Sequence, residues 1–468
     1  MKYDFDIIVI GLGPAGMAVS VMGAEMGLRV CAIEKNKIGG ECMNVGCIPS
    51  KGLLQSARVR HLFSRARDYG LEPSAAPRVL DAQALIRGHV RYINENKTKG
   101  MFSKVTLVLG EGEASFVDPH TVAVGDRRFT AKRIFVCVGT RPALPPVPGL
   151  DTVGALTNEN IFDLDEIPPS LAVLGGGAIG VELAQAFARL GSQVTLVHMD
   201  ARLLPHGDAA AGEFAEAVFR DENIKVLNGR TLKKAEKTAD GVLLVTDRGE
   251  EIRASRLLVG AGRRQDLSAL KLENAGVAYD GRGVKVDDHL RTSAVHIYAP
   301  GDCNGHFPLT HAAMHQGMLA IMNCLLPWPF KRKFKSYPVP WTVFCDPNIS
   351  AVGLCETELK EKGVAYETVE SRYGDYGAAI AEGLGRGFVR VYTTKTGKIL
   401  GAVVAGEGSA EMINEWTLAM QKGLRLHDVM LTMHSFPSMS FLNKRVSEIW
   451  MMNRMKPSWV KRAVRALF

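Results

Sequence analysis

The sequence lacks any apolar stretch long enough to span a membrane, and no basic and then apolar leader precedes its first strand. These absences favour a cytoplasmic, reducing location, where a disulfide is more often catalytic than structural. Hydrophobic residues make up 46% and charged residues 23% of the 468 residues. That composition is typical of a globular chain, and the length predicts about three domains.

Cysteine is scarce and scattered. The eight cysteines have neither the spacing of a secreted disulfide framework nor that of a zinc site, so no metal site is expected. Only Cys42 and Cys47 lie close together among glycines. We expect the other six to be small buried hydrophobic residues; they are Cys31, Cys137, Cys303, Cys324, Cys345 and Cys355.

The formal net charge of +8 raises the question of a nucleic-acid partner. Much of this net charge gathers in two places, residues 331–335 (KRKFK) and the tail from Arg454 to Arg465. No helix-turn-helix pattern and no alternation of aromatic and basic residues accompanies it. We therefore expect no nucleic-acid binding.

A strand, a glycine cluster and a helix open the chain. Residues 4–10 form an almost unbroken apolar run, which predicts a buried parallel strand. A helical stretch from Ala15 to Met26 and a second apolar strand ending at Glu34 follow. The intervening Gly-x-Gly-x-x-Gly pattern allows close approach of a pyrophosphate to the helix N-terminus, and it consists of Gly11, Gly13 and Gly16.

The same unit occurs a second time. Residues 171–174 predict a strand, a helix runs from Val181 to Leu190, and a second strand ends at His198. The distance from the first glycine to the end of the second strand is 23 positions in both copies. This repeat predicts two dinucleotide-binding domains, and its second glycine cluster consists of Gly175, Gly177 and Gly180.

The two copies differ at the residue that ends the second strand. Glu34 suits a free ribose 2′-hydroxyl, as in FAD or NAD, and repels a 2′-phosphate. His198 does not repel a phosphate, and Arg202 follows closely, although Asp200 is also near. The second domain is therefore predicted to favour NADPH over NADH.

The two neighbouring cysteines stand in the segment GGECMNVGCIPSK, residues 39–51. A helix is expected to run on from Pro49. A thiolate at Cys47 would then sit at the positive end of that helix, and Lys51 would favour it further. The alternative is a pair of buried free thiols.

This segment resembles the active-site signature of the class I pyridine nucleotide–disulfide oxidoreductases, which include dihydrolipoamide dehydrogenases, glutathione reductases and mercuric reductases. The resemblance extends over essentially the whole chain. Its other parts are VCVGTRP (136–142), LVGAGR (258–263), APGD (299–302), LTHAAMHQG (309–317) and VPWTVFCDPNISAVGLCE (339–356).

The resemblance implies a homodimeric enzyme that uses FAD and NAD(P)H. Cys47 would face the flavin, and Cys42 would be the thiol that meets the acceptor. Lys51 would pair with Glu182 beside the flavin. The alternative for Glu182 is an ordinary carboxylate on a helix surface. Asp302 would contact the ribityl chain of the flavin, and the remaining cofactor-binding glycines would be Gly139, Gly262 and Gly301.

The C-terminal segment departs from the family pattern. Members that reduce disulfides carry His-x-His-Pro-Thr-x-Ser-Glu there, because a departing thiolate must be protonated near neutral pH. Here Phe436 stands in the place of the acid–base histidine and Phe441 in the place of the glutamate that orients it. His434 aligns with the first, noncatalytic histidine. Ordinary reduction of lipoamide or glutathione disulfide is therefore not expected.

Three readings of the function stay open. The first is an NAD(P)H-dependent flavoprotein disulfide oxidoreductase that reduces a small-molecule or protein acceptor through Cys42–Cys47. In the second, the Cys42 thiolate binds a metal ion or an organic electrophile directly. Mercuric reductases also lack the histidine, but they carry a C-terminal cysteine pair, and no cysteine follows Cys355 here. The third is a flavin-based redox sensor.

The basic tail predicts a short amphipathic helix. Trp459, Val460, Val464 and Leu467 would share one face, with basic residues elsewhere. Peripheral contact with a membrane surface is one interpretation. The other is a tail that packs on its own dimerisation domain.

The predicted fold is α/β, with two doubly wound dinucleotide-binding domains and a C-terminal α+β dimerisation domain. The domain bounds are 1–150 (FAD, first part), 151–270 (NAD(P)), 271–336 (FAD, second part) and 337–468 (dimerisation domain and tail).

Overall fold

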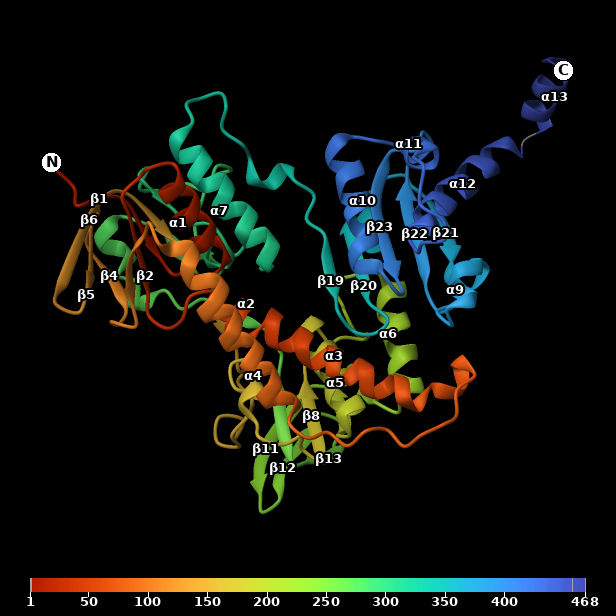
Figure 1. The fold of residues 1–468 in the computed structure, drawn as a ribbon, viewed down its shortest axis with the longest axis horizontal. Helices are drawn as coiled ribbons and strands as arrows, with labels where there is room; N and C mark the ends of the chain where they lie inside the picture. The colour runs from red at the N-terminus through yellow and green to blue at the C-terminus, as the bar shows by residue number, and fades with distance from the viewer. Residues whose placement is uncertain (1, 457, 468) are drawn as a thin grey trace.

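The fold is organised around three main sheets, each with its own helices (Figure 1). The computed structural model describes residues 2–456 and 458–467. Two of the sheets are built on parallel strands and the third is antiparallel. This arrangement confirms the predicted fold class.

The first sheet has β1 at its centre, between β2 and β6. Its strand order is β3-β2-β1-β6-β5-β4, and β18 also pairs with β6. The pairs β1–β2, β2–β3, β1–β6 and β18–β6 are parallel, whereas β4, β5 and β6 form antiparallel hairpins. The strands are β1 (Phe5–Ile10), β2 (Val30–Glu34), β3 (Thr106–Leu109), β4 (Ala114–Asp118), β5 (Thr121–Val124), β6 (Arg127–Val136) and β18 (Ile297–Tyr298).

Two helices pack together on this sheet, α1 (Pro14–Glu25) and α7 (Thr310–Leu325). A Cβ atom on Gly317 of α7 would lie 2.4 Å from the carbonyl oxygen of Ala15, so a glycine is needed for the two helices to approach this closely. Leu267 and Leu270 already lie in the core of the first domain, and the chain that follows adds both β18 and α7 to it.

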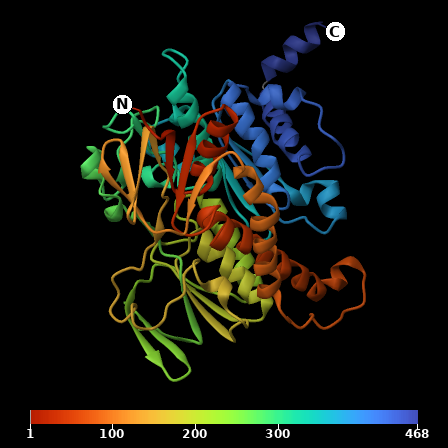
Figure 2. The same cartoon turned by 60° about the vertical axis from the view of Figure 1, so that its left-hand side comes forward.

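The second parallel sheet has the order β10-β9-β8-β14 and lies below the first domain in Figure 2. A separate antiparallel sheet, β11-β12-β13, flanks it. The short strands β7 (Arg141–Pro142) and β15 (Arg263–Arg264) pair between the chain leaving the first domain and the chain returning to it. The other elements are β8 (Ser170–Leu174), α5 (Ala178–Leu190), β9 (Gln193–Val197), α6 (Ala209–Asp221), β10 (Lys225–Leu227), β11 (Leu232–Thr238), β12 (Gly241–Thr246), β13 (Glu251–Ala254) and β14 (Arg256–Val259).

The third sheet is antiparallel, with the order β19-β20-β23-β22-β21. Trp416 and Leu442 lie in the core between this sheet and its helices. The elements are β19 (Trp341–Val343), β20 (Ile349–Gly353), α8 (Glu356–Glu361), β21 (Glu367–Arg372), α9 (Gly377–Ala381), β22 (Phe388–Thr393), β23 (Ile399–Ala405), α10 (Ser409–Lys422), α11 (Leu426–Leu431) and α12 (Phe441–Met455).

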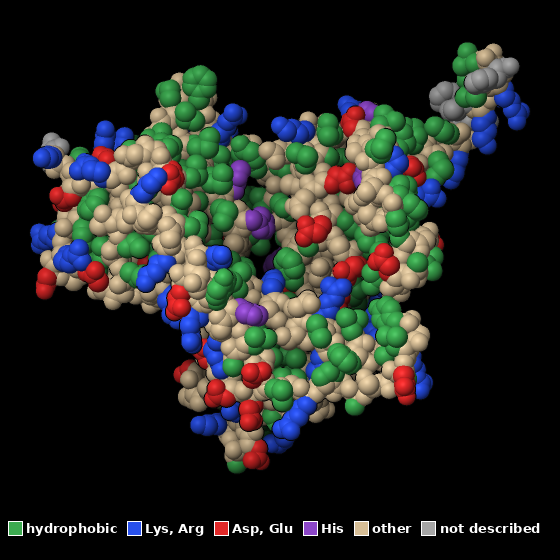
Figure 3. Space-filling view, viewed as in Figure 1, with side chains coloured by type: hydrophobic (Ala, Val, Ile, Leu, Met, Phe, Trp, Pro, Cys, Tyr) green, Lys and Arg blue, Asp and Glu red, His purple; other side chains and the backbone are tan. Residues whose placement is uncertain are grey.

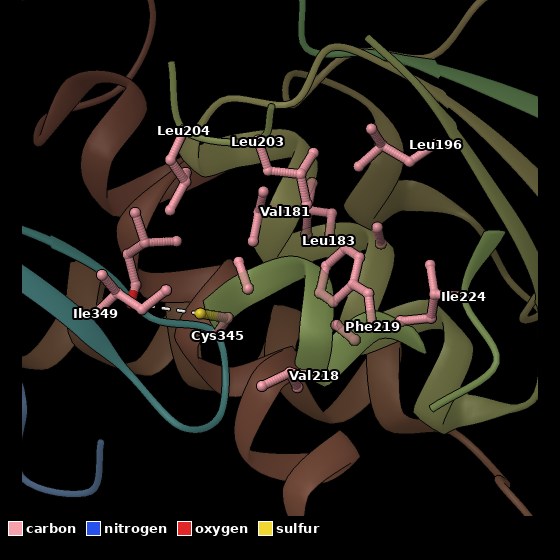
Figure 4. Close-up of a cluster of buried hydrophobic side chains, with 14 of the residues drawn as sticks. Val181, Leu183, Leu196, Leu203, Leu204, Val218, Phe219, Ile224, Cys345 and Ile349 are labelled. Atoms are coloured by element: carbon pink, nitrogen blue, oxygen red, sulfur yellow. Dashed lines mark hydrogen bonds between the residues drawn. The ribbon is translucent and has the colours of Figure 1, made fainter. Parts of the chain in front are cut away.

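A shared hydrophobic core fixes the second domain against the third. Val181 and Leu183 of α5 lie in one buried cluster with Phe219, Cys345 and Ile349 (Figure 4). Because α5 is packed on both sides, a side chain that projects from its first turn has a fixed position.

The helices that carry the predicted cysteines lie between the domains. They are α2 (Gly40–Val45) and α3 (Cys47–Ser64), and α4 (Ala82–Ile93) packs against α3. The α3 helix begins at Cys47, slightly earlier than the expected start at Pro49. Proline is tolerated there because the first turn of a helix leaves its N–H groups without partners inside the helix.

The chain ends in α13 (Ser458–Leu467), which projects away from the rest of the molecule (Figure 1). Residues 461–467 are exposed, so this part of the tail does not pack on the domain that precedes it. The side chains of Trp459 and Val460 lie outside the described residues. Among the helices that the structure describes, none has the length and hydropathy required to cross a membrane.

Candidate active site

Cys42 and Cys47 face each other across a tight connection between two helices. Cys42 lies in α2, and α3 begins at Cys47 directly after Gly46. A Cβ atom on Gly46 would lie only 2.9 Å from the carbonyl oxygen of Glu41, so a larger residue would push the helices apart. Both cysteines are partly buried and are free thiols.

The two thiols have opposite acid–base properties. A hydrogen bond from Cys42 is the largest of several effects that lower the pKa of Cys47 to about 6, and burial opposes it. Thr310 and the charge of Lys51 lower the pKa further, while Glu182 raises it. The same hydrogen bond and burial raise the pKa of Cys42 well above its ordinary value. At neutral pH the arrangement therefore favours a thiolate at Cys47 and a protonated thiol at Cys42.

Thr310 completes the surroundings of Cys47. Its hydroxyl oxygen lies 3.2 Å from the sulfur, and it is the first residue of α7. Sequence reasoning included this segment in the family resemblance but did not single out Thr310. No spacing rule connects residues so far apart in the chain.

Lys51 and Glu182 form the predicted ion pair. The Lys51 Nζ atom lies 2.8 Å from a Glu182 oxygen, and the Glu182 side chain is only 7% exposed. The other carboxylate oxygen accepts a hydrogen bond of 2.8 Å from the backbone N–H of Phe344. Lys51 Nζ also lies 4.5 Å from the centre of the Phe344 ring. The pair therefore joins α3, α5 and the strand end of the third domain beside the cysteines.

A second charged pair, which sequence reasoning missed, lies next to Cys42. Glu41 pairs with Arg263, whose guanidinium also donates a 2.6 Å hydrogen bond to the Thr140 hydroxyl. Asn158 donates to the backbone carbonyl of Val45 at 3.2 Å. These contacts tie the cysteine loop to the two chain segments that connect the first and second domains.

The first glycine cluster forms a cradle that fits the pyrophosphate of FAD. Gly11 has φ +92°, and a Cβ atom on Gly16 would lie 1.9 Å from the Gly11 carbonyl oxygen. Open space surrounds the Cβ position of Gly13, which caps α1 without a side-chain hydrogen bond. The N–H groups of the first turn of α1 therefore face space that an anionic group can fill.

Glu34 and Asp302 fit the sugar and ribityl parts of the same cofactor. Glu34 is buried at the end of β2, where one oxygen accepts from the Leu12 N–H at 2.8 Å and the other from the Asn36 N–H at 2.8 Å. Burial raises the pKa of Asp302, which directly follows Gly301. Carboxylates held in such positions are well suited to accept hydrogen bonds from ligand hydroxyls.

The second glycine cluster repeats the first one closely. Gly175 has φ +116°, and a Cβ atom on Gly180 would lie 1.8 Å from the Gly175 carbonyl oxygen. Gly177 caps α5 with open space at its Cβ position, as Gly13 does for α1. Of the glycines at the chain returns, Gly139 and Gly262 have positive φ and open space at their Cβ positions.

His198 occupies the position that Glu34 has in the first domain. Its Nδ1 atom accepts a 3.1 Å hydrogen bond from the Gly176 N–H, as Glu34 accepts from Leu12. Burial lowers the pKa of His198, which favours the neutral ring, while the charge of Asp200, whose carboxylate oxygen lies 3.2 Å from Nε2, opposes this effect.

Arg202, the predicted phosphate ligand, lies in the loop that follows His198. Its guanidinium donates to the carbonyl oxygens of Pro205 and Gly207, at 3.4 and 3.3 Å. These hydrogen bonds hold the Arg202 side chain against its own loop.

In the C-terminal segment, aromatic rings occupy the two positions that hold an acid–base pair in family members that reduce disulfides. Phe436 is 73% exposed, and its ring centre lies 5.5 Å from that of Phe441, which stacks on Tyr376. Both ring nitrogens of His434 are engaged, Nε2 with Glu415 at 2.8 Å and Nδ1 with the Thr432 carbonyl at 3.0 Å. His434 is therefore held inside its own domain.

Sequence and structure comparisons agree on one family. The family described as pyridine nucleotide-disulphide oxidoreductase matches residues 5–317, and its dimerisation domain matches residues 339–445. The dihydrolipoyl dehydrogenase of Thermus scotoductus is 34% identical over 93% of this chain and 95% of its own. A mercuric reductase of Bacillus cereus is 32% identical over 94% of this chain and 70% of its own.

A solved structure has the same architecture. The HOCl-induced flavoprotein disulfide reductase RclA from Escherichia coli has a TM-score of 0.85 and 27% sequence identity, covering 96% of this chain and 99% of its own. A Cu(II) complex of RclA matches with a TM-score of 0.86.

Proposed function

The chain belongs to the pyridine nucleotide-disulphide oxidoreductases, and from this premise we propose that Cys42 and Cys47 carry electrons from NAD(P)H to a thiophilic acceptor. Enzymes of this family are NAD(P)H-dependent flavoproteins, and this chain is one of them, with a dimerisation domain that supports a homodimer. When bound, FAD supplies the two-electron relay between the nicotinamide and the cysteines.

The cofactors are assigned to the two glycine cradles. FAD would be held by Gly11, Gly13, Gly16, Glu34, Gly139, Gly301 and Asp302. The nicotinamide nucleotide would be held by Gly175, Gly177, Gly180, His198 and Gly262. We keep NADPH as the preferred donor because neutral His198 replaces a repelling carboxylate. Asp200 and the orientation of Arg202 act against this preference.

The difference between the pKa values of the two thiols supports different roles for them. Cys47, with its lowered pKa, is the thiolate that faces the flavin. Cys42 is the interchange thiol that meets the acceptor. Two electrons and one proton convert the disulfide into this thiolate and thiol, and transfer of the two electrons to the acceptor, with release of the proton, restores the disulfide. Lys51 and Glu182 hold the charge beside Cys47 and are positioning residues.

The acceptor class is inferred from Phe436, which stands in the place of the acid–base histidine. A disulfide acceptor releases a thiolate that must be protonated, and the high pKa of Cys42 means that this thiol needs a base to attack. Neither Phe436 nor Phe441 can move a proton. A soft metal ion needs no such base, because binding to the thiol itself displaces the proton.

We therefore propose a soft metal ion, bound directly by Cys42, as the acceptor, rather than lipoamide or glutathione disulfide. Similarity to a mercuric reductase and to RclA, which was solved as a Cu(II) complex, supports this choice. Among the residues that the structure describes, no group of three or more His, Cys, Asp or Glu side chains forms a ready metal site. The metal would accordingly be a substrate, not a resident cofactor.

An anaerobic screen tests the proposal. The FAD-loaded enzyme is reduced with NADH or NADPH and offered disulfides, soft metal ions, electrophiles and quinones. We expect turnover with a soft metal ion that is unchanged in Phe436→His, and none with lipoamide or glutathione disulfide. Phe436→Asn, which is polar but does not titrate, is the matched control. Rapid turnover of a disulfide by the unaltered enzyme would overturn the proposal.

A redox sensor is the second candidate, and it is distinguished by the same screen. It requires no turnover with any acceptor, together with partner binding that changes with the oxidation state of Cys42–Cys47.

We also propose a cytoplasmic location and a contact between the basic tail and a membrane surface, rather than with nucleic acid.

A further inference from the structure

Two segments far apart in the chain combine basic and large apolar side chains without any carboxylate. The first is the loop of residues 326–336, which follows α7; the second is the tail beyond α12. No Asp or Glu occurs between Asp302 and Asp346, and none follows Glu448. The net charge of +8 is therefore distributed unevenly, and these two segments are positive without compensation inside them.

The loop has a fixed base and an uncovered aromatic tip. At the base, the buried side chain of Asn323 donates to the Arg332 carbonyl at 2.9 Å and accepts from its N–H at 2.7 Å. Phe334 is buried just beyond. At the tip, Trp328 is 71% exposed and Phe330 is 63% exposed. The edge of the Trp328 ring system contacts His289, with ring centres 5.9 Å apart, and most of both aromatic side chains remains exposed.

Basic residues follow this tip in the sequence. Lys331, Arg332, Lys333 and Lys335 follow the two aromatic residues directly. Lys333 has one partner within 4 Å, Asp288 at 3.5 Å, and both of these side chains are largely exposed. Trp and Phe next to Lys and Arg are the combination that prefers the boundary between lipid headgroups and acyl chains.

The α13 helix also combines exposed basic side chains with exposed apolar ones. Its described basic residues, Lys461, Arg462 and Arg465, are exposed, and Leu467 is 84% exposed. Val464 and Leu467 are three positions apart, so they share a helix face, whereas Lys461 and Arg465 share another. Helices with one basic and one apolar face bind in the plane of a membrane surface.

The loop and the helix rise from the same side of the molecule. Figures 1 and 2 show both at the upper edge, and Figure 1 shows them on either side of the body. In the space-filling view, hydrophobic side chains gather at the tip of the loop, and basic side chains line α13 (Figure 3). Two separated protrusions on one side reach a flat, extended surface together, whereas a peptide or a small partner would need a continuous groove.

We propose that the loop of residues 326–336 and α13 form a docking face for an anionic lipid bilayer. The aromatic tip and the apolar face of α13 would enter the headgroup region, and the basic residues would pair with lipid phosphates. This inference extends the tail contact proposed above to a second element. It does not depend on which acceptor Cys42 serves.

Flotation with lipid vesicles tests the docking face. The FAD-loaded, full-length dimer is mixed with vesicles of phosphatidylcholine, with or without phosphatidylglycerol. We expect binding only to the anionic vesicles, with loss at high salt. Each basic residue near such a surface contributes roughly fivefold to the partition coefficient. Lys461→Glu/Arg462→Glu is therefore expected to reduce binding by at least about twentyfold.

The loop is tested separately by Trp328→Ala/Phe330→Ala, which is expected to weaken binding without changing the charge. The matched charge control is Lys233→Glu/Lys237→Glu on β11, at the lower edge in Figure 1. This control changes the net charge as much as the α13 variant does, and binding is expected to persist. Reduction of FAD by NAD(P)H in all variants shows that each is folded, independently of the acceptor.

Three outcomes would overturn the proposal. The unaltered protein fails to float with anionic vesicles, or the β11 control loses as much binding as the α13 variant, or the loop variant binds as well as the unaltered protein. Binding to RNA or duplex DNA that the same variants abolish, without vesicle binding, would identify nucleic acid as the partner instead.

Discussion

Thr310 provides the hydrogen bond to Cys47 that can be removed with the least change in side-chain shape. Its hydroxyl oxygen lies 3.2 Å from the Cys47 sulfur, and valine has nearly the same volume. When Cys47 is a thiolate, the hydroxyl must donate, so it stabilises only the charged form. Thr310→Val is therefore expected to raise the pKa of Cys47 from its value of about 6.

The size of the shift follows from the strength of the lost interaction. A hydrogen bond to a charged group contributes about 1.5–3 kcal/mol, and a partly exposed sulfur acceptor belongs at the lower end of that range. One pKa unit corresponds to about 1.4 kcal/mol, so a rise of about one unit is expected. At pH 7 the thiolate fraction would fall from about nine-tenths to about one half.

The assay is an anaerobic pH titration of the charge-transfer absorbance between the thiolate and the flavin in the two-electron-reduced enzyme. Thr310→Ser retains the hydroxyl and is the matched control, with an unchanged midpoint. An unchanged midpoint in Thr310→Val would refute the reasoning. So would an equal shift in both variants, because the cause would then be packing at the start of α7.

Two further predictions follow from the same contacts. Glu182→Gln removes a negative charge that raises the pKa of Cys47, so the same titration should show a midpoint below about 6, opposite to Thr310→Val. Because Lys51 is 36% exposed, the loss of its partner should lower the free energy of unfolding, measured in urea, by only about 1–2 kcal/mol. His198→Glu should place a carboxylate on the Gly176 N–H, as Glu34 is placed on that of Leu12. The ratio of kcat/KM for NADH over NADPH should then rise by roughly tenfold. An unchanged ratio would show that the residue at position 198 does not discriminate between the 2′-hydroxyl and the 2′-phosphate.

The overall fold could be predicted because its signals are local and repeated. Two glycine clusters with the same spacing gave two nucleotide-binding units, and the cradles around Gly13 and Gly177 have matching geometry. The Lys51–Glu182 pair was also expected, and the structure places its members 2.8 Å apart. In that case the resemblance to a family, not the spacing of the residues, provided the prediction.

The contacts around the cysteines were harder to foresee. Thr310, Phe344 and Arg263 reach the site from segments more than 200 residues away from the cysteines, and no periodicity records such a meeting. Arg202 shows the converse difficulty. Its position in the sequence suits a phosphate, but two backbone carbonyls of its own loop engage it.

The central claim is that electrons pass from NAD(P)H to the pair formed by Cys42 and Cys47, with Cys47 next to the flavin. Anaerobic addition of NADH or NADPH, followed by absorbance, tests it most directly. The account predicts a thiolate-to-flavin charge-transfer band in the unaltered enzyme, and no such band in Cys47→Ser. Absence of the band from the unaltered enzyme, or its survival in Cys47→Ser, would contradict the account.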